Sequence, residues 1–213
     1  MKLVAWIAGA LARFDGAAPA TKPEVTPVIL VHGIHSTAAD MVRLANHLRH
    51  EGRAVFTPTL DPANGKASIE SLAAQLAAYA DREVPGRKFD LIGFSMGGLV
   101  SRYYVQRLGG IDRVGRFVTL ATPHNGTQMA RLFSGLGHEQ MRPGSEFLRD
   151  LERDAAVLRR VGFTSLYTPL DTIIVPASSS EQSAANNVRV WGAMHPSFVL
   201  EKRCLKAVAD SIR

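Results

Sequence analysis

Ser95 lies between two glycines in the pattern Gly93-Phe94-Ser95-Met96-Gly97, at the end of an apolar run and just before a helical pattern. A serine hydroxyl by itself is a weak nucleophile, so attack on a carbonyl needs a neighbouring base and a group that orients this base. Glycines on both sides of the serine allow the sharp strand-to-helix turn that exposes such a hydroxyl. The pattern therefore predicts a nucleophilic serine at the edge of a sheet.

The candidate base is His195. Around a serine on this kind of turn, the partners follow in the chain order serine, acid, histidine. Of the seven histidines, four precede Ser95, and His124 and His138 precede every late carboxylate that could orient a base. Because His195 alone follows the late apolar runs, the order of residues selects it.

The candidate acid is Asp171, which stands at the end of the segment TSLYTPLD and precedes His195. Glu181, in the serine-rich loop ASSSEQS, is the alternative acid. A serine-rich loop is a less suitable place for a group that must hold a fixed orientation. The sequence therefore favours Asp171 and leaves Glu181 open.

Acyl transfer also needs hydrogen-bond donors for the oxyanion that develops on the carbonyl oxygen, usually two backbone N–H groups. The amide of Met96, directly after the serine, is one candidate, and the amide of Ile34, in the loop after the first apolar run, is the other. His32 and His124 are expected to tie down loops. Three further side chains are candidates for lining a substrate pocket: His35, Phe94 and Met129.

These residues must be positioned by an alternation of short apolar runs and longer helical patterns, which predicts a parallel sheet covered by helices on both faces. Several runs are apolar on consecutive residues, as expected of strands buried on both faces. The predicted strands cover 25–31, 54–60, 89–94, 116–122, 171–176 and 187–191. The fold class is therefore α/β, a three-layer αβα sandwich with a mostly parallel sheet of about six strands.

Helical spacing of apolar residues predicts helices between the strands. The expected helices run from Thr37 to Gly52, over 68–82, after Ser95 as far as Gly109, over 145–161 and over 198–212. Residues 126–162 interrupt the alternation and are predicted to form a small helical insertion. Its first apolar residues belong either to the core or to a flap over the site: Met129, Leu132, Phe133 and Leu136.

A length of 213 residues fits one domain, which we assign to residues 24–213. Residues 1–23 combine a lysine, an apolar stretch and Ala18-Pro19-Ala20, a combination that resembles a secretory signal. The early Arg13 and Asp15 instead favour a short N-terminal helix packed on the domain. Export to the periplasm or medium and a cytoplasmic location therefore both stay open.

Composition narrows the classes of partner. The net charge is +6, but the basic residues are scattered, which favours a solvated basic surface and no nucleic-acid partner. No apolar run is long enough for a membrane span. The single cysteine, Cys204, excludes an intramolecular disulfide and is expected in a helix, and no spacing of ligands predicts a metal site.

Five motifs together resemble the α/β-hydrolase superfamily, and within it the small bacterial lipases and esterases: VILVHGI, GFSMGGLVSRYY, VTLATPHNGT, MRPGSEFL and the spacing of Asp171 and His195. The resemblance extends from residue 25 to the C-terminus. It implies a minimal α/β-hydrolase fold with a small helical insertion and no large cap. It also implies a serine carboxylester hydrolase that forms an acyl-enzyme on Ser95, acts on acyl esters or lipids and needs no metal or organic cofactor.

Other functions share this machinery, because fold alone does not separate esterases from thioesterases, amidases and acyltransferases. A non-catalytic binding protein with the same fold is a further alternative, which the presence of Ser95, Asp171 and His195 disfavours. Phe94 stands where many of the similar enzymes carry His or Tyr, a difference expected to affect packing next to the serine. Transient contact with a lipid interface is compatible with the sequence, and the oligomeric state stays open.

Overall fold

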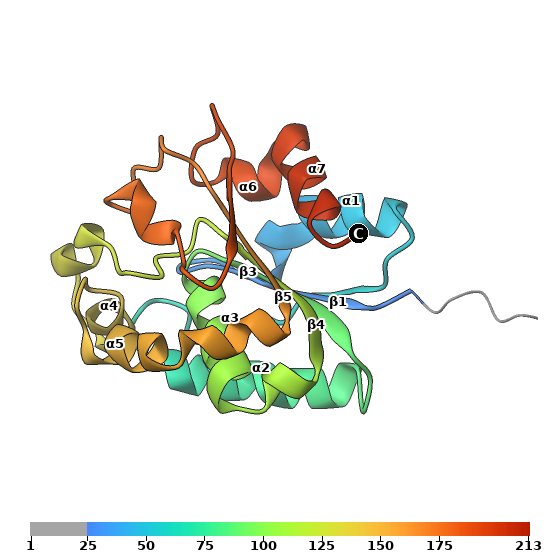
Figure 1. Ribbon diagram of the computed structural model, residues 1–213, viewed down its shortest axis with the longest axis horizontal. Helices are drawn as coiled ribbons and strands as arrows, with labels where there is room; N and C mark the ends of the chain where they lie inside the picture. Colours follow the sequence, from blue (N-terminus) through green and yellow to red (C-terminus); the bar gives the residue numbers. More distant parts are fainter. Residues whose placement is uncertain (1–24) are drawn as a thin grey trace, which may run out of the picture.

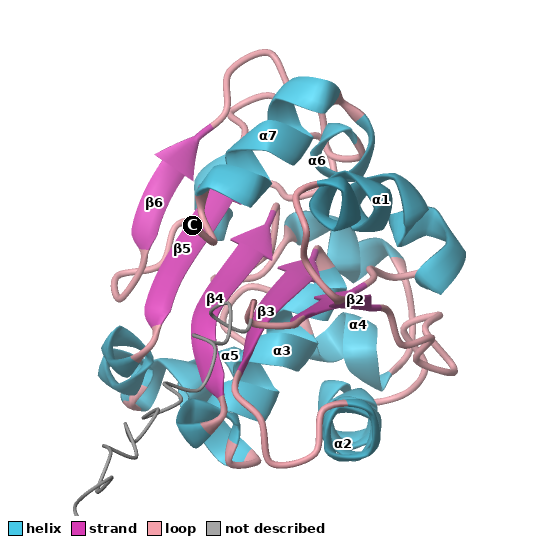
Figure 2. Ribbon diagram, turned by 90° about the vertical axis from the view of Figure 1, so that its right-hand side faces the viewer, coloured by secondary structure: helices cyan, strands magenta, loops and turns pink. Residues whose placement is uncertain are grey.

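The structure is a computed structural model that describes residues 25–213, so the segment predicted over residues 1–23 lies outside the described residues. Six strands form one parallel sheet in the order β2-β1-β3-β4-β5-β6. Their bounds are β1 Val28–Val31, β2 Val55–Phe56, β3 Phe89–Phe94, β4 Val114–Leu120, β5 Gly162–Tyr167 and β6 Asn186–Arg189. The predicted fold class is confirmed, and all five strand pairings are parallel. Figure 2 shows the twisted sheet from β6 at one edge toward β2.

Helices cover both faces of the sheet. One face carries α1 (Val42–His50), α6 (Ser197–Leu200) and α7 (Lys202–Asp210), and the other carries α2 (Ile69–Glu83), α3 (Met96–Arg107), α4 (Leu136–Gln140) and α5 (Glu146–Arg153) (Figure 1). Shorter 3₁₀ helices span Ala38–Met41, Gly110–Asp112, Gln128–Leu132, Ala155–Arg160 and Ala177–Ser180. The molecule is therefore the three-layer sandwich that the alternation of elements predicts.

The core explains why β1 is apolar at every position. Val28 and Leu30 pack in the cluster that contains α1 and α7, whereas Ile29 and Val31 pack in the cluster that contains α2 and α3. All four side chains are fully buried. Successive side chains of a strand point to opposite faces, so a strand covered on both sides needs an unbroken apolar run.

The strand order reverses at β1. The chain leaves β1 toward β2 on one side of it and returns to β3 on its other side. Loops at the carboxyl ends of β1 and β3 therefore diverge, and this point is where open α/β sheets form a crevice for ligands. Ser95 follows β3 directly, and His32 to His35 follow β1 directly, so the two loops singled out in the sequence meet at this crevice.

The strand predicted over 171–176 is wrong. The fifth strand is Gly162–Tyr167, and residues 171–176 form a loop at its carboxyl end. In this loop the amides of Ile173 and Ile174 donate to the carboxylate of Asp171. In a strand, backbone groups pair with those of a neighbouring strand. Asp171 nevertheless follows a strand, as its candidate role requires.

The helix predicted over 145–161 is interrupted at Asp154, between α5 and the 3₁₀ helix Ala155–Arg160. In a continuous helix the carbonyl of Leu151 would accept the amide of Ala155. Instead this carbonyl accepts hydrogen bonds from the side chains of Arg102 and Gln106 on α3, both at 2.9 Å. The final helix is likewise divided, since Glu201 between α6 and α7 has an extended backbone.

Of the apolar residues for which core and flap were alternatives, three lie at the surface: Leu132, Phe133 and Leu136 are 70%, 52% and 58% exposed. Met129 is half-buried. The interpretation as core residues is therefore wrong for Leu132, Phe133 and Leu136.

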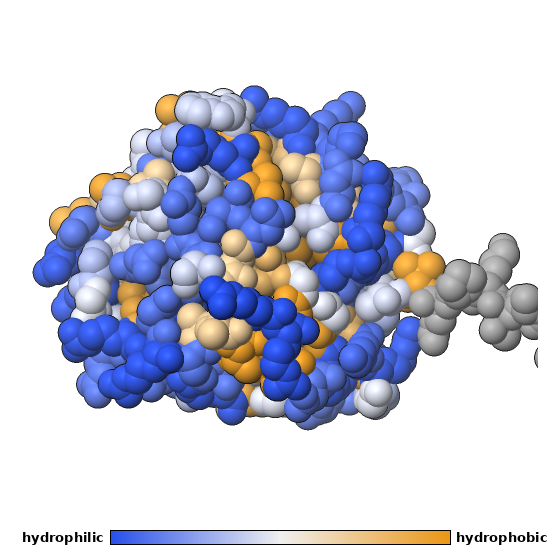
Figure 3. Space-filling view, viewed as in Figure 1, coloured by the Kyte–Doolittle hydropathy of each residue, from blue (hydrophilic) through white to orange (hydrophobic). Residues whose placement is uncertain are grey.

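Figure 3 shows one face of the molecule, on which hydrophilic residues predominate and apolar ones form narrow patches. Within residues 25–213, no helix has the length and apolarity needed to cross a membrane.

Candidate active site

Ser95 occupies the turn between β3 and α3 in a strained backbone conformation, with φ 53° and ψ −124°. A positive φ is uncommon for a residue with a side chain, and such strain gathers at functional sites. The Ser95 amide donates a hydrogen bond of 2.8 Å to the carbonyl of Leu120 at the end of β4, which helps to hold the turn. The local geometry is that of a nucleophile elbow.

Two glycines make this turn sterically feasible. A Cβ atom at Gly97 would lie 2.2 Å from the carbonyl oxygen of His32, and one at Gly93 would lie 2.5 Å from the Cα atom of Gly98. Both distances are far below contact distance, so only glycine lets α3 approach the end of β3 and the loop after β1. The Gly-x-Ser-x-Gly spacing thus has a steric reason in this chain.

Asp171 and His195 form a directly bonded pair at the same edge of the sheet. The Nδ1 atom of His195 lies 2.8 Å from Oδ2 of Asp171. The second carboxylate oxygen accepts the amides of Ile173 at 2.8 Å and Ile174 at 2.9 Å. The side chain of His195 is 10% exposed and that of Asp171 is 2% exposed. A carboxylate bonded through both oxygens cannot rotate freely, so it fixes the orientation of the imidazole.

His195 also lies beside the elbow. Its ring packs on the ring of Phe94, the residue before Ser95, with the ring centres 5.0 Å apart. The loop that holds it, between β6 and α6, is tied to the end of β5 by a hydrogen bond of 2.8 Å from the Thr168 hydroxyl to the carbonyl of Ala193. The carboxyl ends of β3, β5 and β6 therefore bring the serine, the acid and the base to one edge.

Glu181, the alternative acid, is engaged elsewhere. Its carboxylate accepts a hydrogen bond from the hydroxyl of Tyr167 and lies 3.9 Å from the guanidinium of Arg189. This pair of contacts directs the Glu181 side chain to β5 and β6, and it is Asp171 that contacts His195.

The two candidate oxyanion donors flank Ser95. Met96 is the first residue of α3, so its N–H has no acceptor within the helix, and the positive end of the helix dipole adds to its effect on a developing anion. A Cβ at Gly33 would lie 3.1 Å from Cβ of Ser95, which brings the loop after β1 against the serine. In that loop the amide of His35 is bonded to the carbonyl of Ala63, which makes the preceding amide, that of Ile34, the better candidate.

An apolar pocket of about 220 Å³ opens beside Ser95. The structure places His35 and Met129 in its wall, whereas Phe94 packs on His195. Most of the other lining residues were not predicted from the sequence, although the pair Ile173-Ile174, just beyond Asp171 and Thr172, was a visible apolar pattern. The wall consists of Ile34, His35, Ser95, Pro123, Thr127, Met129, Ala130, Phe133, His138, Met141, Ile173 and Ile174.

His32 and His124 are buried and hold loops near the site. The Nε2 atom of His32 accepts the amide of Leu60 at 2.9 Å, and Nδ1 donates to the carbonyl of Gly33 at 2.9 Å. Nε2 of His124 lies 3.0 Å from the hydroxyl of Thr119. Burial lowers the pKa of both imidazoles, and for His124 the nearby Arg102 lowers the pKa further. Both rings are therefore neutral at pH 7.

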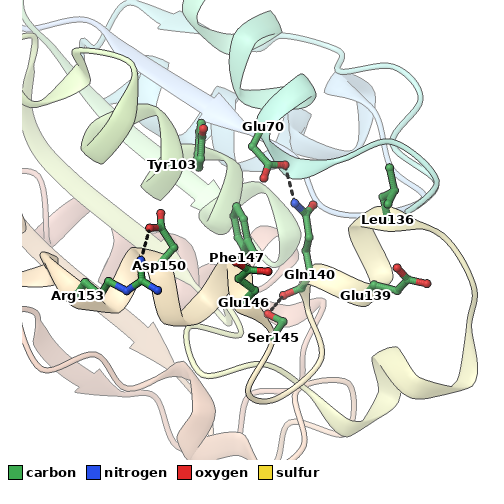
Figure 4. A pocket seen from close by; sticks show the side chains of 10 residues that line it. All are labelled: Glu70, Tyr103, Leu136, Glu139, Gln140, Ser145, Glu146, Phe147, Asp150 and Arg153. Atoms are coloured by element: carbon green, nitrogen blue, oxygen red, sulfur yellow. Dashed lines mark hydrogen bonds and ion pairs between the residues drawn. The ribbon is translucent and has the colours of Figure 1, made fainter.

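A larger cavity of about 450 Å³ lies on the other side of α4, between α2, α3 and α5 (Figure 4). Its polar groups are largely bonded to each other, since Glu70 binds Gln140 and Asp150 pairs with Arg153. It contains no histidine and none of the three catalytic candidates. In the part of the chain that the structure describes, no group of three or more His, Cys, Asp or Glu is arranged to hold a metal ion. Of the three catalytic candidates, Ser95 lines the smaller, apolar pocket.

A family model described as palmitoyl protein thioesterase matches residues 27–168 of this chain. The match covers the elbow at Ser95 and ends before Asp171 and His195.

Two triacylglycerol lipases are similar in sequence. The enzyme of Burkholderia plantarii is 26% identical over 210 residues, which cover 88% of this chain and 54% of that protein. The enzyme of Pseudarthrobacter phenanthrenivorans is 26% identical over 173 residues, which cover 76% of this chain and 49% of that protein. The chain thus spans about half the length of these curated relatives.

Solved lipase structures share the fold. The mature form of the Bacillus licheniformis lipase BlEst2 superposes with a TM-score of 0.75 at 17% identity, over 88% of this chain and 93% of that chain. Aspergillus fumigatus lipase B superposes with a TM-score of 0.73 at 18% identity, over 88% of this chain and 52% of that chain. At these identities the likeness concerns the fold, a sheet of parallel strands flanked by helices.

Proposed function

This chain belongs to the palmitoyl protein thioesterase family and has the α/β-hydrolase fold of lipases, and from this we infer that it is a serine hydrolase. We propose that it cleaves carboxylic esters through an acyl-enzyme on Ser95. The observation that carries this proposal is the hydrogen bond of 2.8 Å between His195 and Asp171, next to a serine in an elbow conformation. A serine, an imidazole and a buried carboxylate in this arrangement are the parts that acyl transfer requires.

The proposed reaction has two halves. Oγ of Ser95 attacks the carbonyl carbon of the ester while Nε2 of His195 takes the hydroxyl proton, and the carbonyl oxygen becomes an oxyanion that accepts the amides of Ile34 and Met96. When the C–O bond to the alcohol breaks, His195 returns the proton to the leaving oxygen. Water then attacks the acyl-enzyme by the same route and releases the acid.

Asp171 contributes by holding the imidazole. Its bond to Nδ1 of His195 keeps the proton on that nitrogen, so Nε2 is free to act as a base, and the carboxylate stabilises the imidazolium that forms. Because the other Asp171 oxygen is occupied by two amides, the carboxylate needs little reorganisation during the reaction.

The pocket supports an acyl group as the part of the substrate that is held. Its wall consists mainly of aliphatic, aromatic and thioether side chains, among them Met129, Phe133 and Ile174, and Ser95 lies in the same wall. Apolar pockets bind alkyl chains by removing their surface from water. The substrate class that follows is an ester of an alkyl carboxylic acid, including esters in lipids.

A second candidate, thioester hydrolysis, is favoured by one observation, the family match over residues 27–168. The same three residues would act, with sulfur in place of oxygen in the leaving group. Comparison of an oxygen ester and a thioester that carry the same acyl chain separates the two candidates, because the acyl contacts are then identical. A higher kcat/KM for the thioester favours the second candidate.

The decisive experiment is the variant Ser95→Ala, assayed by p-nitrophenol release from acetyl and butyryl esters. We expect hydrolysis to disappear while the melting temperature stays close to that of the unmodified protein. A matched control is Ser101→Ala, at a fully buried serine of α3 that lies outside the pocket wall, and it should keep its activity. Unchanged hydrolysis in Ser95→Ala would refute the proposed mechanism.

A further inference from the structure

The side chain of Thr127 joins two segments of the site. Thr127 follows β4, is 5% exposed and caps the 3₁₀ helix Gln128–Leu132. Its hydroxyl donates to the carbonyl of Ile173 at 2.7 Å and accepts the amides of Val175 at 3.0 Å and Met129 at 3.3 Å. One donor and two lone pairs are all that a hydroxyl offers, so every hydrogen-bonding position of the Thr127 hydroxyl is used.

The backbone around Thr127 strengthens the same connection. The amide of Thr127 donates to the carbonyl of Met141 at 2.8 Å, and the amide of Gln128 donates to the carbonyl of Val175 at 2.9 Å. Thr127 therefore ties together the start of the 3₁₀ helix, the end of α4 and residues 171–175, which we call the acid loop.

The acid loop is the segment that orients Asp171. Its first half is fixed by the Asp171 carboxylate, which binds the amides of Ile173 and Ile174. Its second half is fixed by Thr127, which binds the carbonyl of Ile173 and the amide of Val175. Since Ile173 takes part in both sets of bonds, a displacement of the second half moves the two amides that hold the carboxylate.

We propose that Thr127 is a positioning residue that, through the acid loop, holds Asp171 in the orientation needed to bond His195. The catalytic consequence of this inference rests on the proposed function. Thr127 also lines the acyl pocket together with Ile173 and Ile174, so the chain segment that orients the acid forms part of the surface on which the acyl group lies.

The test compares Thr127→Val, which keeps the shape of the side chain and removes its hydrogen bonds, with Thr127→Ser, which keeps the hydroxyl. The control is Thr164→Val, the same change at a buried threonine of β5. For each protein, kcat and KM are measured with p-nitrophenyl butyrate. The proton on Nδ1 of His195 is followed as a low-field resonance in the proton NMR spectrum, which reports its bond to Asp171.

In Thr127→Val we expect kcat to fall about 10- to 100-fold, as displaced catalytic groups do, while KM changes little because the pocket keeps its volume. The low-field resonance should shift upfield or broaden. Thr127→Ser should restore both readouts, and Thr164→Val should leave both unchanged.

Three results would overturn the inference: a normal kcat and resonance in Thr127→Val, a serine variant as defective as the valine variant, or an equal loss in Thr164→Val. The NMR readout does not depend on which substrate the enzyme uses. If no ester is hydrolysed by the unmodified protein, the proposed function fails, whereas the spectra still decide whether Thr127 orients the pair of Asp171 and His195.

Discussion

Nδ1 of His195 lies 2.8 Å from Oδ2 of Asp171, although the two residues are 24 positions apart and follow different strands. Parallel strands bring their carboxyl ends to one edge of the sheet, and the loops after β5 and β6 meet there. The bond therefore depends on the sheet order, because β5 and β6 are neighbours.

Replacement of the acid should separate its role from that of Glu181. In Asp171→Asn we expect kcat for ester hydrolysis to fall by about 10⁴-fold, the effect of the equivalent change in a serine protease triad, because an amide can stabilise the wrong imidazole tautomer. Glu181→Gln should keep most of the activity, since Glu181 contacts Tyr167 and Arg189. Steady-state kinetics check this, and a larger loss in Glu181→Gln would make Glu181 the acid.

The acyl pocket should lengthen when Phe133 is truncated. The Phe133 ring stacks on the His138 ring with centres 5.2 Å apart, and both line the pocket, while half of Phe133 faces solvent. Phe133→Ala should therefore open one end of the pocket. Each additional methylene buried contributes about 0.8 kcal/mol, so two methylenes would raise kcat/KM for longer esters about tenfold.

A chain-length series of p-nitrophenyl esters measures this change. Leu132→Ala is the matched control, because Leu132 is the adjacent residue, is 70% exposed and is not part of the pocket wall. The same shift in both variants would point to a general effect of apolar residues in this segment and would contradict the role of Phe133.

Stability should fall as the solution becomes mildly acidic. Burial, and secondarily Arg102, holds the pKa of His124 well below its ordinary value of 6.5, and burial also lowers the pKa of His32. The unfolded chain protonates both rings near pH 6.5, whereas the folded protein keeps them neutral, so below that pH the unfolded state binds more protons. His124 then removes up to about 1.4 kcal/mol of unfolding free energy per pH unit, until the pH reaches its pKa in the folded protein, and His32 acts in the same direction.

Urea denaturation between about pH 7.5 and pH 5.5 measures this dependence. His124→Gln cannot take up the proton, so its unfolding free energy should vary less with pH than that of the unmodified protein, even if it is less stable throughout. An identical slope in the two proteins would show that His124 does not contribute to the acid sensitivity.

The elbow should not tolerate a side chain at Gly97. A Cβ there would lie 2.2 Å from the carbonyl oxygen of His32, so α3 or the loop after β1 must shift, which costs about 1 to 3 kcal/mol of unfolding free energy. Gly97→Ala should lose activity because that shift moves Met96 and Ser95. Gly162→Ala is the control, since its Cβ would meet nothing closer than 3.6 Å; melting temperatures and ester hydrolysis of both variants test the difference.

The sequence by itself predicted the α/β class, five of the six strands and the three residues placed in the proposed chemistry. Local patterns suffice for these features, because an unbroken apolar run such as Val28–Val31 indicates a strand covered on both faces, and because Ser95, Asp171 and His195 each follow a strand whose end lies at the same edge.

Only the tertiary structure decided what the apolar residues after the fourth strand do. Ile173 and Ile174 resemble part of a strand in sequence, but their amides donate to the carboxylate of Asp171. The predicted helix over 145–161 is divided because the side chains of Arg102 and Gln106 bind the carbonyl of Leu151. These outcomes depend on side chains that are distant in sequence. Such partners compete for backbone groups only after the layers have packed, and no local periodicity records that competition.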